Sequence, residues 1–314
     1  PARAGDAYKP LAGCMEAADE EERREIAAKP YRQVIGSAAN PARLWHLSMA
    51  YALSELSQYV SDPSRRAWRM FQVVGDFLAT QGDEGLYFAR EPQPGYRQLA
   101  VVTDANHARC KVTRKSVDAA TIFLYGNPVD YGAKKQGNVA LSSFEAELGG
   151  AARGGVKAKR ILHTLLGMRI LVELPVPMYI DNEGVVKALH NVTHESSAKH
   201  IETRMFWLKD EVERNVFEPL HILSGDNVAD VLTKPMSDKG FWRLMDDITG
   251  KELTDVGKLI RRGKEAYKSN KVGRPDLARP EVELHIDLPG PPMEDYYGGT
   301  RSATHPVAVV GVCE

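Results

Sequence analysis

The sequence predicts a mixed α/β fold in which helices pack on a sheet. Between residues 97 and 248, short apolar runs of strand length are followed by longer stretches with helical spacing. Three strands come first, and helices and strands then alternate, which is typical of a mixed sheet. A stretch that reads as purely helical precedes this region, so we expect a small helical segment in front of the α/β fold.

The apolar runs predict five strands, and the stretches between them predict helices. The first run, Leu99 to Thr103, stops at Asp104, and Gly126-Asn127-Pro128 is a turn signal between the second and third runs. We expect strands at 99–103, 121–125, 129–135, 176–180 and 218–223, and helices from Ser142 to about Gly167, from about 183, over 200–214 and from near Asp226.

The chain is predicted to divide into four parts. Apolar side chains at helical spacing on both sides of a break at Asp62-Pro63 indicate helices, and Pro94-Gly95 indicates a linker after them. The charged start and the proline-rich end carry too little apolar surface to offset the entropy lost on ordering. The expected parts are a tail (1–29), a helical segment (30–92), an α/β domain (93–250) and a disordered tail (251–314).

The composition excludes several classes of protein. A formal net charge of −1 excludes a uniformly basic nucleic-acid coat, so contact with a polyanion has to use local basic patches. The three cysteines lie far apart, which indicates reduced thiols in an intracellular protein, cytoplasmic or nuclear. No apolar run approaches the roughly 18 residues of a membrane span, so no membrane partner is expected. The start, Pro1-Ala2-Arg3, reads as a piece of a longer chain.

Two aspartates end predicted strands. Asp104 follows the first strand, and Asp181 follows the strand at 176–180, directly before a helix that begins near Glu183. If these strands are parallel neighbours, both carboxylates emerge at the carboxyl edge of the sheet, where open α/β sheets place their sites. Two carboxylates that lie so close together repel each other unless a cation lies between them, so the pattern favours a metal site.

A third acid has to be chosen between Glu145 and Glu147. Ser142 and Glu145 have the spacing of a capping box, which gives Glu145 a structural task at the start of the long helix. Glu147 instead heads a row of small and apolar residues that is expected to face the sheet. A glutamate on a buried face needs a partner or a metal, so we choose Glu147.

The fourth acid is Asp230, about one turn into a short helix. Asp226 or Asn227 can cap this helix, and Pro235 ends it. Each of the acids has an ordinary structural reading when it is taken alone, as a turn, a cap or a solvated helix residue. The ordered set of Asp104, Glu147, Asp181 and Asp230 on a strand–helix–strand–helix framework is what indicates a functional site.

These acids lie in stretches that resemble the RNase H domain of copia-type retrotransposon polyproteins. The resemblance covers roughly residues 29–248, and the upstream stretch Lys29 to Ser37 resembles the region that follows the polymerase palm. The matching stretches are Thr103-Asp104-Ala105, the run from Val139 to Glu147, Tyr179-Ile180-Asp181-Asn182, Lys199-His200-Ile201-Glu202 and the run from Asn227 to Pro235.

The resemblance implies an RNase H-like fold, a mixed five-stranded sheet with helices on both faces, preceded by a remnant of the reverse transcriptase thumb or connection region. It implies an endonuclease that cuts the RNA strand of RNA–DNA hybrids, with the rest of the reverse transcriptase polyprotein as a partner. The four acids are then ligands of two Mg²⁺ or Mn²⁺ ions. Basic residues that suit phosphate contacts are Lys111, Arg114, Lys115, Lys134 and Lys135.

Some features depart from the family pattern. Four glycines lie in the long helix, at positions 149, 150, 154 and 155, and each costs a helix interior about 1 kcal/mol relative to alanine. The spacing of His194 and His200 is altered, and His221 is expected within a strand rather than in a mobile catalytic loop. The sequence therefore leaves open an impaired enzyme, a catalytically inactive relic, or a nucleic-acid-binding module adopted by a host.

Overall fold

Five strands form one mixed sheet in the structure, a computed structural model that describes residues 16–80, 85–86, 88, 98–109, 113–191 and 199–249. The strand order is β3-β2-β1-β4-β5. The first three strands pair antiparallel, whereas β1, β4 and β5 run parallel. All five predicted strands are confirmed: β1 (Leu99–Asn106), β2 (Val117–Leu124), β3 (Asn127–Lys135), β4 (Val176–Ile180) and β5 (Phe217–His221).

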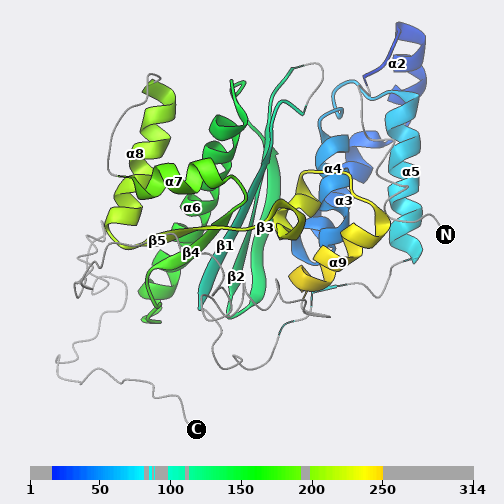
Figure 1. Cartoon of the computed structure of the whole chain (residues 1–314). Helices are drawn as coiled ribbons and strands as arrows, with labels where there is room; N and C mark the ends of the chain where they lie inside the picture. The colour runs from blue at the N-terminus through cyan, green and yellow to red at the C-terminus, as the bar shows by residue number, and fades with distance from the viewer. Residues whose placement is uncertain are drawn as a thin grey trace, which may run out of the picture. The chain divides into compact units, whose positions relative to one another are not determined.

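One face of the sheet is covered by three helices. Side chains that point to this face, among them Val101, Ile122 and Met178, share a buried cluster with residues of these helices. In Figure 1 the three helices lie together on one side of the strands. They are α6 (Ser143–Gly167), α7 (Glu183–His190) and α8 (Lys199–Glu213), and all three were expected.

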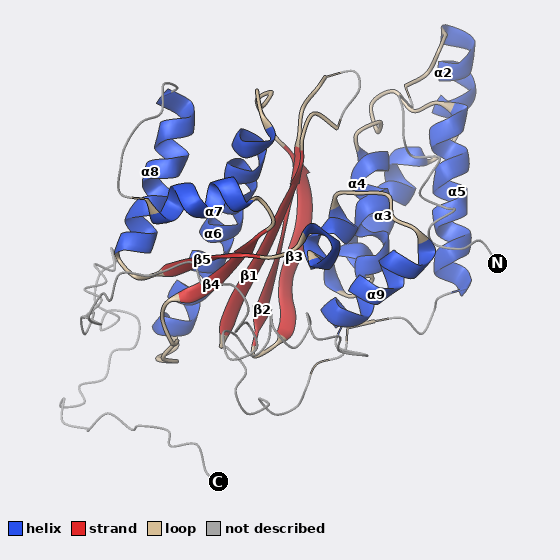
Figure 2. Cartoon of the chain, in the orientation of Figure 1, coloured by secondary structure: helices blue, strands red, loops and turns tan. Residues whose placement is uncertain are grey.

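The opposite face is covered by the N-terminal and C-terminal helices. Val102, Phe123 and Tyr179 point to this side and belong to the second buried cluster. Figure 2 shows helices on both sides of the sheet, so the predicted RNase H-like arrangement is confirmed. The elements on this face include α3 (Tyr31–Leu44), η2 (Leu47–Met49), α4 (Ala50–Ser57), α5 (Arg65–Thr80), η4 (Val228–Leu232) and α9 (Asp238–Thr249).

The helical segment before the sheet shares its core with the sheet. Leu56 and Val74, from α4 and α5, lie in the same buried cluster as Val102 of β1. The break expected at Asp62-Pro63 falls between these two helices. A domain boundary near residue 92 stays a prediction. The expected N-terminal tail contains α2 (Glu20–Ala27), and the expected disordered tail at 251–314 lies outside the described residues.

The four glycines at positions 149, 150, 154 and 155 lie where α6 meets its neighbours most closely. The helix continues without interruption through all four of them. A Cβ atom on Gly154 would lie 2.5 Å from Cγ2 of Thr103, and one on Gly150 would lie 3.1 Å from the backbone oxygen of Asp104. On Gly155 it would lie 3.1 Å from Met178 Cε. The loss of helix propensity at these positions therefore accompanies close packing of α6 on the sheet, which the sequence alone did not indicate.

Among the described residues, the structure contains no helix with both the length and the apolar character needed to cross a bilayer.

Candidate metal centre

Asp104 and Asp181 meet at one edge of the sheet because β1 and β4 are parallel neighbours. Thr103 and Ile180 are the last register partners of β1 and β4, so Asp104 and Asp181 lie side by side where this pairing ends. Asp104 itself lies within β1, because the strand continues to Asn106, paired with β2, beyond the end predicted at Thr103. The Asp104 side chain is fully buried, whereas Asp181 is half-buried. The predicted convergence of these two carboxylates at the carboxyl edge is confirmed by the strand pairing.

Glu147 reaches this edge from α6. Its Oε1 accepts a hydrogen bond from the backbone N–H of Ala105 at 3.2 Å. Its Oε2 is buried and has no hydrogen-bond partner among the described residues. A buried carboxylate oxygen without a donor carries a large desolvation cost, and a cation bound beside it would remove that cost.

Glu145, the alternative acid, takes part in capping the start of α6. The backbone N–H of Glu145 donates to Ser142 Oγ at 3.1 Å, and Oε2 of Glu145 accepts from the backbone N–H of Leu141 at 2.7 Å. The expected capping box is therefore present, except that Glu145 reaches back to the residue before the cap. The choice of Glu147 over Glu145 as the site acid agrees with these contacts.

Three of the four predicted acids form a group that could hold a metal ion. One carboxylate oxygen from each of Asp104, Glu147 and Asp181 lies within 4.8 Å of the others. These oxygens come from two strand ends and one helix that are far apart in sequence. An all-oxygen set of this kind suits Mg²⁺ or Mn²⁺ better than zinc.

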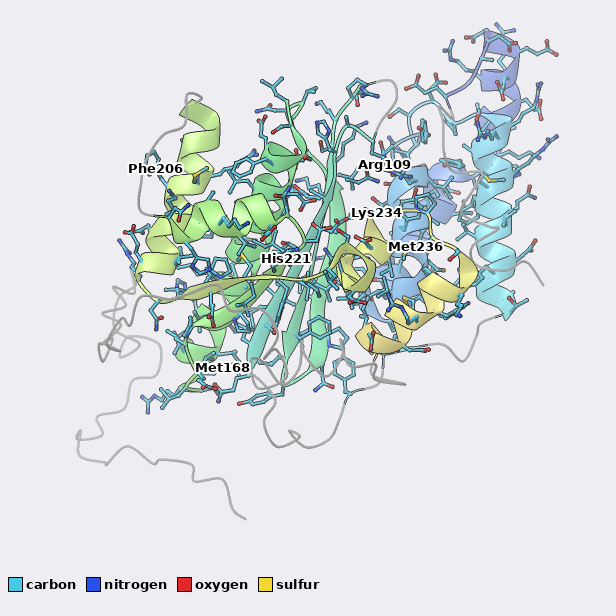
Figure 3. All side chains as sticks on the ribbon, in the orientation of Figure 1. Arg109, Met168, Phe206, His221, Lys234 and Met236 are labelled. Atoms are coloured by element: carbon cyan, nitrogen blue, oxygen red, sulfur yellow. The ribbon has the colours of Figure 1, made fainter. Side chains whose placement is uncertain are left out.

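Asp230 lies next to this group and is joined to it through a lysine. It belongs to the short helix η4, whose N-cap is Asn227, one of the two caps expected. The Lys234 ammonium is 2.7 Å from Asp230 Oδ1 and 3.2 Å from Asp104 Oδ1. Figure 3 shows Lys234 between the sheet edge and the C-terminal helices. The structure thus brings all four predicted acids into one neighbourhood, although only three of them form the group described above.

Glu147, Asp181 and Asp230 hold their protons more tightly than free carboxyls. Burial, followed by the charges of Asp104 and Asp181, raises the pKa of Glu147 to about 9. Burial and the proximity of Asp104 raise the pKa of Asp230 to about 7, and the same two causes raise the pKa of Asp181. Burial lowers the pKa of Lys234, but Asp104 and Asp230 together raise it above its ordinary value. Such shifts are typical of buried carboxylates that lie close together with no cation bound between them.

These shifts predict that the metal-free protein loses stability as pH rises. A raised pKa means that the native state binds more protons than the unfolded state between the two values, so raising the pH favours unfolding. For Glu147 this window runs from 4.5 to about 9. We expect the melting temperature in EDTA to fall across this range, and to fall less steeply in Glu147→Gln, which cannot ionise at this position. Equal slopes in the two proteins would contradict the assignment of the shift to Glu147.

Several residues that hold the acids in place were not predicted. Thr233 Oγ1 donates a hydrogen bond to Asp104 Oδ2, and Asn227 Nδ2 donates to the backbone oxygen of Thr103 at 2.9 Å. Asn106 Nδ2 donates to the backbone oxygen of Thr233 at 3.2 Å. These contacts fasten η4 and the residues after it to the end of β1. The i,i+4 spacing of Asp230 and Lys234 is the one local signal that could have indicated the lysine.

Of the three histidines considered above, the structure describes the side chain of one near the acids. His221 is the last residue of β5, as expected, and its Nε2 is 3.2 Å from the backbone oxygen of Asp181 (Figure 3). Ser224 Oγ donates to Asp181 Oδ2 at 3.0 Å. His194 and the side chain of His200 lie outside the described residues.

Four of the five basic residues predicted to contact nucleic acid lie at one end of the β2–β3 hairpin. Lys135 pairs with Val117 and Lys134 with Asp118, while Lys115 directly precedes β2 with its neighbour Arg114. Asp104 of β1 pairs with Ala119 on the other side of β2, so the basic end of the hairpin lies at the same edge of the sheet as the acids. Lys135 Nζ donates to Gln58 Oε1 at 3.0 Å. Lys111 lies outside the described residues.

The chain is similar to transposon polyproteins. It is 28% identical over 211 residues to the retrovirus-related Pol polyprotein from transposon RE2 of Arabidopsis thaliana, which covers 67% of this chain and 14% of that protein. It is 27% identical over 219 residues to the polyprotein from transposon TNT 1-94 of Nicotiana tabacum, covering 68% and 16%. The chain therefore spans about a seventh of the length of these relatives.

A shorter relative and two solved structures were also found. The secreted RxLR effector protein 161 of Plasmopara viticola is 32% identical over 118 residues, which is 38% of this chain and 81% of that protein. LC11-RNase H1, isolated from compost, has a TM-score of 0.35 at 17% identity and covers 50% of this chain and 99% of its own. The foamy viral protease-reverse transcriptase in complex with dsDNA has a TM-score of 0.38 at 13% identity. The match covers 66% of this chain and 42% of that chain. No protein-family model matches the chain.

Proposed function

We propose that the chain is the RNase H region of a retrovirus-related Pol polyprotein of the copia-transposon type, to which it is similar over about two thirds of its length, and that it cleaves the RNA strand of RNA–DNA hybrids. The observation that carries the proposal is the group of three carboxylates, Asp104, Glu147 and Asp181, with oxygens within 4.8 Å of one another. The buried, unpartnered Oε2 of Glu147 supports a cation at this place.

Asp104, Glu147, Asp181 and Asp230 would hold two divalent cations, Mg²⁺ or Mn²⁺. When bound, such cations activate a water for attack on a phosphodiester and stabilise the leaving oxygen. The chain contributes a rigid set of oxygen donors. Asp104 is fixed by its position in β1 and by the Thr233 hydroxyl, and Glu147 by its bond to the Ala105 N–H. The tight packing of α6 on β1 restricts changes in the distance between Asp104 and Glu147.

The hybrid would bind along the edge of the sheet that carries the acids. Arg114, Lys115, Lys134 and Lys135 lie at this end of the β2–β3 hairpin and would contact phosphates, and the sequence adds Lys111, which lies outside the described residues, to this proposed set. Selection of the RNA strand would depend on contacts to its 2′-hydroxyl groups across a shallow minor groove. The other parts of the reverse transcriptase polyprotein would present the hybrid to this edge.

Cleavage of defined duplexes tests the proposal. We expect the purified chain to cut the RNA strand of a labelled RNA–DNA hybrid in Mg²⁺ or Mn²⁺, and to leave double-stranded DNA and double-stranded RNA intact. EDTA should stop the reaction, and Asp181→Asn prepared in the same way controls for contaminating nuclease. Binding of the hybrid without metal-dependent cutting would overturn the nuclease and favour the inactive relic, whereas cutting of duplex DNA would overturn the proposed substrate.

A further inference from the structure

The acid cluster already contains one cation, which is the side chain of Lys234. Its ammonium lies between two carboxylates, 2.7 Å from Asp230 Oδ1 and 3.2 Å from Asp104 Oδ1. The Asp104 side chain is 0% exposed and the Asp230 side chain 10% exposed, so water can neutralise neither of them well. The lysine itself is 32% exposed, so it is the most solvent-accessible of these three side chains.

Asp104 takes part in two groupings of acids. One of its carboxylate oxygens lies within 4.8 Å of oxygens of Glu147 and Asp181, and within the described residues no side-chain cation is recorded in an ion pair with those two acids. Asp104 Oδ1 also lies 3.2 Å from the Lys234 ammonium, which pairs with Asp230 Oδ1 at 2.7 Å. Of two cations that share Asp104, one would lie with Glu147 and Asp181, and the other would lie with Asp230, in the place that the lysine occupies.

We propose that Lys234 is a resident counter-ion: its ammonium holds Asp104 and Asp230 together while no divalent cation is shared by them, and it must swing away before they can share one. The inference rests on the proposed function, because it assumes that these acids bind metal. It predicts two unequal positions. The one at Asp104, Glu147 and Asp181 fills at low cation concentration, and the one at Asp104 and Asp230 fills only in competition with the lysine.

An ordinary helical ion pair is the competing explanation, since Asp230 and Lys234 have i,i+4 spacing. The chain offers a matched example of such a pair in Glu183 and Lys187, which also lie four residues apart with an N–O distance of 2.7 Å. Their side chains are 59% and 58% exposed, and the lysine makes no ion pair with a second acid in the described part of the chain. Removing Lys187 removes a helical pair alone, whereas removing Lys234 also leaves two buried acids without their cation.

Binding of Mn²⁺ to the whole chain, followed by electron paramagnetic resonance and calorimetry, tests the proposal without a nuclease assay. In the parent we expect one strong and one weak Mn²⁺. In Lys234→Met the second Mn²⁺ should bind about ten- to a hundredfold more tightly, the range by which groups next to metal ligands alter affinity. The melting temperature in EDTA should fall in this variant and recover fully in Mn²⁺, while Lys187→Met should match the parent in both measurements.

Lys234→Arg keeps the charge and covers the case in which the methionine variant does not fold without metal. It should retain the weak second site. Three results would each overturn the counter-ion proposal. They are tight binding of two Mn²⁺ by the parent, an unchanged affinity of the second site in Lys234→Met, and a higher affinity of the second site in Lys234→Arg. If the Mn²⁺ results are as expected and the parent does not cut the hybrid, the proposed nuclease fails and the counter-ion stands. If the parent cuts and the second site is the same with and without Lys234, the counter-ion alone fails.

Discussion

Glutamine at position 147 is expected to abolish metal-dependent cleavage while the protein stays folded. The Glu147 carboxylate supplies one of the three oxygens within 4.8 Å, and its Oε2 has no hydrogen-bond partner among the described residues that would otherwise explain its burial. Loss of a metal ligand removes several kcal/mol of transition-state stabilisation, so cleavage of a hybrid should fall by about a thousandfold or more. The rate of hybrid cleavage in Mg²⁺, with the melting temperature measured beside it, checks this.

Glu145→Gln is the matched control for that variant. Both glutamates are buried in the first turns of α6, two residues apart. Glutamine at 145 can still accept the hydrogen bond from the Leu141 N–H, so the helix start is retained. Cleavage by Glu145→Gln should therefore remain near that of the parent. If both variants lose activity together, or if Glu147→Gln cuts as well as the parent, Glu147 is not a metal ligand.

The positions of three acids could be predicted because local patterns determine them. Asp104 and Asp181 each end an apolar run of strand length, and parallel pairing of β1 and β4 places them side by side. Glu147 could be separated from Glu145 because Ser142 and Glu145 are a recognisable cap, and the capping contacts are present. In these cases a local pattern determines where each side chain lies on its own strand or helix, and the pairing of β1 with β4 then brings the two aspartates together.

The supports of the site could not be predicted, because they join segments that are far apart in sequence. Lys234 and Thr233 contact Asp104 across 130 and 129 positions, and no spacing rule connects a loop after η4 with the end of β1. The close packing around these glycines of α6 could not be predicted for the same reason. Their low helix propensity is visible in the sequence, but the surface on which they pack belongs largely to β1, β2, β4 and α8. A departure from local preference therefore marked a tertiary contact here and not a weakened helix.

Alanine at position 154 is expected to destabilise the protein even though alanine favours helix. The new Cβ would lie 2.5 Å from Thr103 Cγ2 and 3.3 Å from Val101 Cγ1, so α6 or β1 has to move. Overpacking of this kind costs about 1–3 kcal/mol, against a gain of up to about 1 kcal/mol in helix propensity. Gly167→Ala, in the last turn of the same helix, places its Cβ where nothing lies within 4 Å and should raise the melting temperature slightly.

Gly154→Ala should lower the rate of hybrid cleavage even under conditions where the variant is fully folded. Thr103 directly precedes Asp104, and Glu147 lies two turns before Gly154 on α6, so a shift between helix and strand separates two of the acids. Misplacement by about 1 Å can cost a hundredfold in rate. We therefore expect hybrid cleavage well below that of the parent at a temperature where both proteins are fully folded, and a still lower rate in Gly154→Val. Unchanged cleavage in both variants would mean that the close contact of α6 with β1 does not set the distance between Asp104 and Glu147.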